Sequence, residues 1–175
     1  MADGIALEGI KLIVTALPIA CAQGTDLKAR EEMQIAASMG ATAFQKGLGM
    51  IHSLSHPLSA KYNTHHGLAN ALLTPVCLKY IEGADLNADQ RKRFTRVLTL
   101  FEEAGCAKAT LAETCTAFFE SLGINFGLQN HQVLKEDLEY LSHQAIEDPC
   151  HAGNMIPVTR QIMLDMYQQA FPGVS

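Results

Sequence analysis

The sequence predicts an all-α fold, a helical bundle formed as a single domain over residues 1–175. Apolar residues recur at intervals of three and four along most of the chain, which is the period of an amphipathic helix. No stretch of useful length alternates with a period of two, and no Asn-Gly pair marks a hairpin turn. These two observations favour helices and exclude a large sheet.

The composition is that of a compact protein without a highly charged partner. Hydrophobic residues make up 48% of the chain and charged residues 18%, with a net charge of −5. No run of Lys or Arg offers a surface for nucleic acid or for an anionic membrane. The longest apolar stretch, residues 10–22, contains Lys11 and Pro18 and is too short to cross a bilayer. We therefore expect no nucleic-acid partner and no membrane partner.

The cysteines and the N-terminus predict a cytoplasmic location. The five cysteines are an odd number and form no CxxC pair, which argues against a disulfide framework and against a cysteine zinc site. Asp3 and Glu8 stand where a signal peptide would need basic residues.

The first helix is predicted from an apolar stripe and is expected to end where Pro18 and Gly24 interrupt the pattern. Thr25 or Asp26 can cap a second helix over residues 27–47. This second segment is rich in small residues, which favour close helix packing. Its larger apolar residues are expected in the core of the bundle: Met33, Ile35 and Met39.

Further helices follow in the second half of the chain. Asn87 caps a helix over residues 88–105 that Gly105 ends, and Gly123 ends another over residues 110–123. Residues 133–148 form a helix that stops before Pro149, and Thr159 caps the last helix, over residues 159–171. Residues 123–132 and 149–157 are predicted to be short loops.

Four of the seven histidines lie between positions 52 and 66. His52 and His56 are four residues apart, so a helix over residues 49–58 places both rings on one face, where they could share a cavity. His65 and His66 follow a turn at residues 62–64 and open the next apolar helix. The stretch does not match the HExxH metalloprotease pattern, because the residues between the two histidines are Ser53, Leu54 and Ser55, and none of them is the glutamate that this pattern uses as a general base. Metal binding and ordinary hydrogen bonding inside a bundle both remain open for these residues.

The stretch GLGMIHSLSHPLSAKYNTHHGLANALLTP, residues 47–75, is similar to the signature of the iron-containing (group III) alcohol dehydrogenase family. Residues 2–13 and 145–171 resemble the flanking segments of that family. The resemblance implies that His52 and His66 are metal ligands and that His56 is catalytic and lies beside the substrate. His65 departs from the proline often found at its position.

The same resemblance implies a function shared between two domains. The family uses a divalent metal, Fe or Zn, and binds NAD(P) in an N-terminal α/β domain that this sequence lacks, since no glycine-rich turn follows a strand. The family's other two ligands, an Asp and a His, would precede Met1. We expect the C-terminal half of a dehydrogenase for a small alcohol or aldehyde, inactive without its N-terminal half.

Two other functions stay open from the sequence. The four clustered histidines could hold a transition metal without redox catalysis. The chain could also serve as an interaction module that forms a homo-oligomer through apolar surface.

Overall fold

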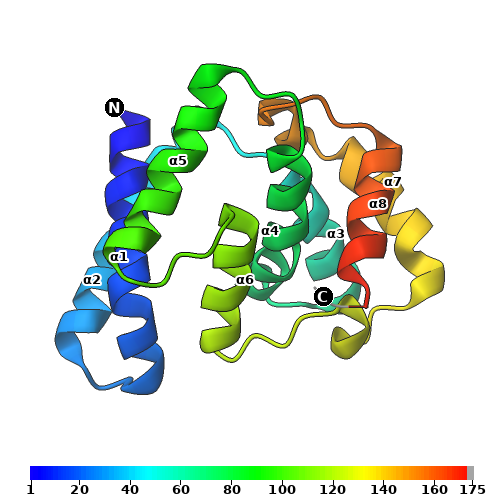
Figure 1. Ribbon diagram of the computed structural model, residues 1–175. Helices are drawn as coiled ribbons and strands as arrows, with labels where there is room; N and C mark the ends of the chain where they lie inside the picture. Colours follow the sequence, from blue (N-terminus) through cyan, green and yellow to red (C-terminus); the bar gives the residue numbers. More distant parts are fainter. Residues whose placement is uncertain (173–175) are drawn as a thin grey trace. The chain divides into compact units, whose positions relative to one another are not determined.

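The computed structural model describes residues 1–172 and contains only helices in that range (Figure 1). The all-α prediction is confirmed. The α-helices are α1 (Ala2–Ala22), α2 (Leu27–Ala43), α3 (Met50–Tyr62), α4 (His66–Glu82), α5 (Ala88–Glu103), α6 (Leu111–Ser121), α7 (Leu138–Glu147) and α8 (Arg160–Ala170). Short 3-10 helices are η1 (Phe44–Lys46), η2 (Leu128–His131), η3 (Lys135–Asp137) and η4 (Pro149–Gly153).

The chain divides into two compact units, and the boundary after Thr114 falls inside α6. The first unit comprises residues 1–47 and 86–114, and the second comprises residues 48–85 and the described residues from 115 onward. The expectation of a single domain over residues 1–175 stays a prediction.

In the first unit, α1 and α2 form a helical hairpin, and α5 packs on α1. Asp26 caps α2 by accepting a hydrogen bond from the Ala29 backbone at 2.9 Å, as predicted. The two helices approach closely at Gly9, where an added Cβ would lie 3.3 Å from Met39 Cβ. The core prediction is wrong for Ile35, which is 43% exposed, and Met33 and Met39 are only half-buried. The buried residues of α2 are Ala29 and Ala36.

Helix α1 is longer than the sequence analysis predicted, because it continues through Pro18 to Ala22. A proline removes one hydrogen bond to the residue four positions earlier, and here only the last turn follows it. Helix α1 is long and apolar enough to cross a membrane. The core helices of soluble proteins and N-terminal signal sequences share this length and composition. The absence of a membrane partner therefore stays a prediction.

The second unit packs α3 against α4, α7 and α8, with α4 also contacting α8. Tyr167 on α8 is fully buried, and its hydroxyl donates to the Leu54 carbonyl of α3 at 2.6 Å. Other fully buried residues of this core are Met50, Leu58, Leu72, Leu73, Leu128, Leu141, Met163 and Met166. This packing fixes α3, the helix that carries the first two histidines.

Some predicted helix bounds are wrong: α2 ends at Ala43 and not at residue 47, and α7 begins at Leu138 and not at residue 133. The predicted loops over residues 123–132 and 149–157 contain the 3-10 helices η2 and η4. The predicted caps of α5 and α8 agree with the structure. Asn87 and Gln90 form a reciprocal capping box at the start of α5, and Thr159 accepts from the Ile162 backbone at the start of α8. Gly105 and Gly123, which follow α5 and α6, adopt positive φ angles of 74° and 84°.

Candidate metal and active site

Helices α3 and α4 bring three of the four clustered histidines together. Helix α3 begins at Met50, so His52 and His56 lie one turn apart, with ring centres separated by 6.0 Å. Asn63 adopts a left-handed conformation (φ 53°) after α3 and turns the chain, and α4 then begins at His66. The His66 ring centre lies 5.4 Å from that of His52 and 5.3 Å from that of His56.

His65 is not among the three contacting rings. It is exposed at the N-cap position of α4, where its side chain makes no capping hydrogen bond. Its ring lies beside Gly67, on which an added Cβ would be 3.4 Å from His65 Nδ1. His65 therefore lies outside the cluster of three rings, although it is adjacent to His66 in sequence.

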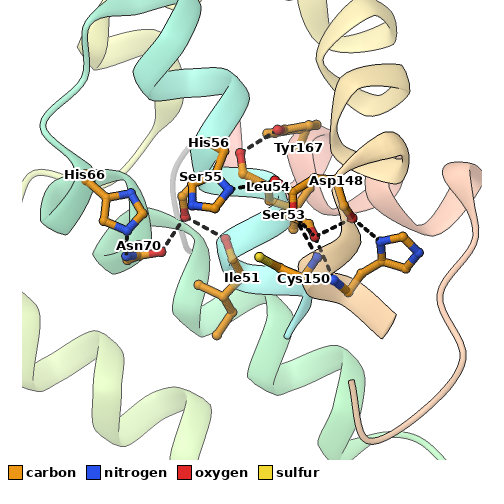
Figure 2. Close-up of polar contacts among 11 residues, drawn as sticks. Ile51, Ser53, Leu54, Ser55, His56, His66, Asn70, Asp148, Cys150 and Tyr167 are labelled. Carbon is orange, nitrogen blue, oxygen red and sulfur yellow. Dashed lines mark hydrogen bonds and ion pairs between the residues drawn. The ribbon is translucent and has the colours of Figure 1, made fainter. Parts of the chain in front are cut away.

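The environment of His52 favours its neutral form. Burial lowers its pKa, and the neighbouring His66 and His56 rings lower that pKa further, while Asp148 acts in the opposite direction. A metal ion binds the unprotonated imidazole, so a lowered pKa keeps His52 ready to act as a ligand. On α4, His66 Nε2 lies 3.1 Å from the side-chain nitrogen of Asn70, whose oxygen accepts from the buried Ser55 hydroxyl (Figure 2).

The carboxylate of Asp148 contacts this histidine cluster. It caps η4 and lies against α3, where its Oδ2 is 2.7 Å from His56 Nδ1 (Figure 2). Its Oδ1 accepts from the Cys150 backbone at 2.8 Å and from Ser53 Oγ at 3.0 Å. Partial burial acts to raise the pKa of Asp148, but hydrogen bonds from His56, Cys150 and Ser53 outweigh it, so the pKa lies well below its usual range. Asp148 is thus an ionised acceptor.

Hydrogen bonds join η4, and Asp148 at its N-cap, to the start of α3. Ser53 is fully buried and accepts from the His151 backbone at 2.8 Å. Asn154 Oδ1 accepts from the Met50 backbone at 3.2 Å. Gly153 lies so close to the chain before α3 that an added Cβ would be 2.2 Å from the Leu48 carbonyl oxygen. No side chain larger than hydrogen fits there without a backbone shift.

The side chains in this region suit a divalent transition-metal ion. With a metal–nitrogen bond of roughly 2.1 Å, imidazoles around one tetrahedral ion have ring centres about 5 Å apart. The three rings here have centres 5.3–6.0 Å apart, so the donor type and the spacing fit. Within residues 1–172, His56, Asp148 and Cys150 also form a group whose ligand atoms all lie within 4.8 Å of one another. The assignment of His52 and His66 as ligands, and of His56 as catalytic, stays a prediction.

Sequence reasoning missed Asp148, Cys150 and Asn70. Asn70 could have been found, because it lies one helical turn after His66. The sequence around Asp148 indicated only that a helix ends before Pro149. Asp148 contacts His56, which is 92 residues away in the sequence. Such a contact depends on how α7 and η4 pack on α3.

Comparisons with known proteins show the family of this chain. Residues 1–171 match the sequence model of the Fe-containing alcohol dehydrogenase family, C-terminal domain. The chain is 31% identical over 175 residues to lactaldehyde reductase of Escherichia coli strain K12, with 98% of this chain aligned. It is 33% identical over 175 residues to NAD-dependent methanol dehydrogenase of Bacillus methanolicus, with 96% of this chain aligned.

Solved structures are also similar. A 1,3-propanediol oxidoreductase superposes with a TM-score of 0.84 at 30% identity, covering 97% of this chain and 45% of that chain. An alcohol dehydrogenase from Oenococcus oeni gives a TM-score of 0.85 at 27% identity, with the same two coverages. The chain spans 45% of the length of both curated relatives named above.

Proposed function

Because the chain belongs to the Fe-containing alcohol dehydrogenase family, whose C-terminal domain it matches over residues 1–171, we propose that it supplies the metal- and substrate-binding half of an NAD(P)-dependent enzyme. The substrate is a small alcohol or aldehyde. The observation that carries this proposal is the contact among the His52, His56 and His66 rings. Two of its relatives, a lactaldehyde reductase and a methanol dehydrogenase, support the substrate class.

His52 and His66 are proposed to hold the divalent ion, Fe or Zn. A bound ion would supply Lewis acidity that favours the deprotonated alcohol. The buried environment of His52 keeps its imidazole neutral for this role. His66 comes from a different helix, so the site depends on the packing of α3 against α4.

His56 is proposed to lie beside the substrate, where it orients the alcohol or relays its proton toward water. Its side chain is 41% exposed, so solvent reaches it while one edge of the ring contacts Asp148. We propose that the nicotinamide is positioned by an N-terminal domain and that the 175-residue chain alone is inactive, because hydride transfer depends on that positioning. If no N-terminal domain joins the chain, we propose that a second copy of the chain is its partner. We also propose a cytoplasmic location, because a reducing compartment keeps thiols free, and all five cysteines are free.

Metal binding by the purified chain tests the ligand assignment. We expect about one Zn²⁺ or Fe²⁺ per chain, bound more weakly than by a four-ligand site, because two ligands are proposed to come from elsewhere. His52→Ala and His66→Ala should each abolish binding in calorimetry, whereas His56→Ala should keep most of it. His143→Ala is the matched control, since His143 is exposed on α7. Unchanged affinity in His52→Ala would contradict the proposal.

Activity should appear only when an N-terminal half is supplied. Mixing the chain with the N-terminal domain of a family relative should restore NAD-dependent oxidation of small primary alcohols and diols, followed by absorbance of the reduced nicotinamide. His56→Ala should lower that rate without removing the metal. Tight metal binding with no activity in any mixture would favour the non-catalytic metal-binding function instead.

A further inference from the structure

The contact between Asp148 and His56 has the geometry of a carboxylate that orients a histidine. Asp148 Oδ2 lies 2.7 Å from His56 Nδ1, a short and strong hydrogen bond. The carboxylate cannot turn away, because its other oxygen accepts from Ser53 Oγ and from the Cys150 backbone. Asp148 side-chain exposure is only 18%, so water competes little for these oxygens.

This contact decides which nitrogen of His56 carries the proton. An ionised carboxylate can only accept hydrogen bonds, so the hydrogen between the two residues belongs to His56 Nδ1. In the neutral ring, Nε2 then carries the free lone pair. The ring is also held by its stacking on His66, at an interplanar angle of 22°.

We propose that Asp148 is a positioning residue, which fixes His56 in the Nδ1–H tautomer and leaves Nε2 as the atom able to accept a proton. Ser53 is the supporting residue of this device, because its buried hydroxyl joins Asp148 to α3 within one turn of His56. The serine at position 53, between the two histidines of HSLSH, therefore has a structural role.

The tautomer matters for the proposed function, on which this consequence rests. A histidine that takes a proton from an alcohol needs an unprotonated nitrogen facing the substrate. If Nδ1 were the unprotonated atom, it would face Asp148, and two acceptors would repel each other. Asp148 therefore prevents the unproductive tautomer.

Nitrogen NMR of the ¹⁵N-labelled, metal-free chain tests the proposal directly, with two-bond proton–nitrogen correlations recorded at about pH 8, above the ordinary histidine pKa. The His56 resonances are assigned with His56→Gln. We expect Nδ1 in the protonated shift range and Nε2 in the unprotonated range. Asp148→Ala should shift His56 toward the Nε2–H tautomer or a mixture. Asp165→Asn is the matched control, because that carboxylate contacts Gln161 on α8 and not the site.

Two results would overturn the proposal. One is a wild-type His56 with unprotonated Nδ1, which needs no variant and is independent of enzyme activity. The other is Zn²⁺ addition that moves the His56 Nδ1 signal together with the Cys150 signals, because it would assign His56, Asp148 and Cys150 to a metal ion. If Asp148→Ala fails to fold, Ser53→Ala replaces it and should weaken the His56 preference while Asp148 remains. Absence of dehydrogenase activity in the mixture with an N-terminal domain, with the expected tautomer intact, would count against the proposed function alone.

Discussion

Helices α1 and α3 differ sharply in what they bury. Helix α1 is long and apolar, yet only three of its 21 residues are buried: Gly9, Val14 and Ala16. Helix α3 has 13 residues, and six of them are buried, including Ser53 and Ser55. The helix that carries the histidines is therefore the better packed one, although its sequence is more polar.

Buried polar side chains, and not apolar content, therefore organise this site. Ser53 and Ser55 are fully buried, and their hydroxyls contact Asp148 and Asn70, which in turn contact His56 and His66. A buried hydroxyl without a partner would cost about 1–3 kcal/mol, so these serines restrict the loop and helix that meet α3. Helix α1 has no comparable restriction among its three buried residues.

Truncating one apolar side chain in each helix should give the largest difference in the free energy of unfolding. Leu54→Ala on α3 should lower the free energy of unfolding by about 2–5 kcal/mol, because Leu54 is fully buried. Ile19→Ala on α1 should cost less than about 1 kcal/mol, because Ile19 is 48% exposed. Urea denaturation measures both. Equal losses would mean that α1 is packed as tightly as α3.

The second effect is a dependence of stability on pH that originates at Asp148. Its pKa in the folded chain lies below the unfolded value of about 3.9. The ionised carboxylate therefore stabilises the fold above that unfolded value, and the contribution is lost as the pH falls toward the folded pKa. Urea unfolding from about pH 6 to about pH 3 should show stability falling with pH in the wild type and falling less in Asp148→Asn.

Some slope should remain in Asp148→Asn, since Lys46 lowers the pKa of Asp3, and Tyr62 and Lys61 lower that of Asp137. Asp165→Asn serves again as the control and should keep the wild-type slope. An Asp148→Asn slope as steep as the wild type would remove Asp148 as a source of acid sensitivity.

Local sequence signals predicted most of the fold. Capping at Asp26, Asn87 and Thr159 was readable because each side chain bonds a backbone amide three residues later. The end of α1 was predicted too early, because a proline in the last turns of a helix costs only one hydrogen bond. The exposure of Ile35 could not be predicted, because the apolar pattern of α2 does not show which of its apolar side chains pack against another helix.

The site was predictable only where it is local. The four-residue spacing of His52 and His56 fixes their shared face, and the ring contact confirms it. The approach of His66 needs the left-handed turn at Asn63, which the sequence suggested only as a turn. The contact of Asp148 with His56 joins positions 92 residues apart, and no periodicity carries that information.

Two glycine-to-alanine substitutions should change the free energy of unfolding least, and in opposite directions. Gly153→Ala in η4 should lower the free energy of unfolding by about 1–3 kcal/mol, because the new Cβ would lie 2.2 Å from a backbone oxygen of Leu48 and must displace backbone. Gly40→Ala in α2 should raise it by about 0.5–1 kcal/mol, because nothing lies within 4 Å and alanine restricts the unfolded chain. Urea denaturation gives both values.

Gly153→Ala should also disturb the His56 nitrogen resonances, because η4 carries Asp148 at its N-cap, whereas Gly40→Ala should leave them unchanged. A Gly153→Ala chain with wild-type stability and wild-type His56 resonances would show that the loop moves independently of α3 and that its contacts do not fix Asp148.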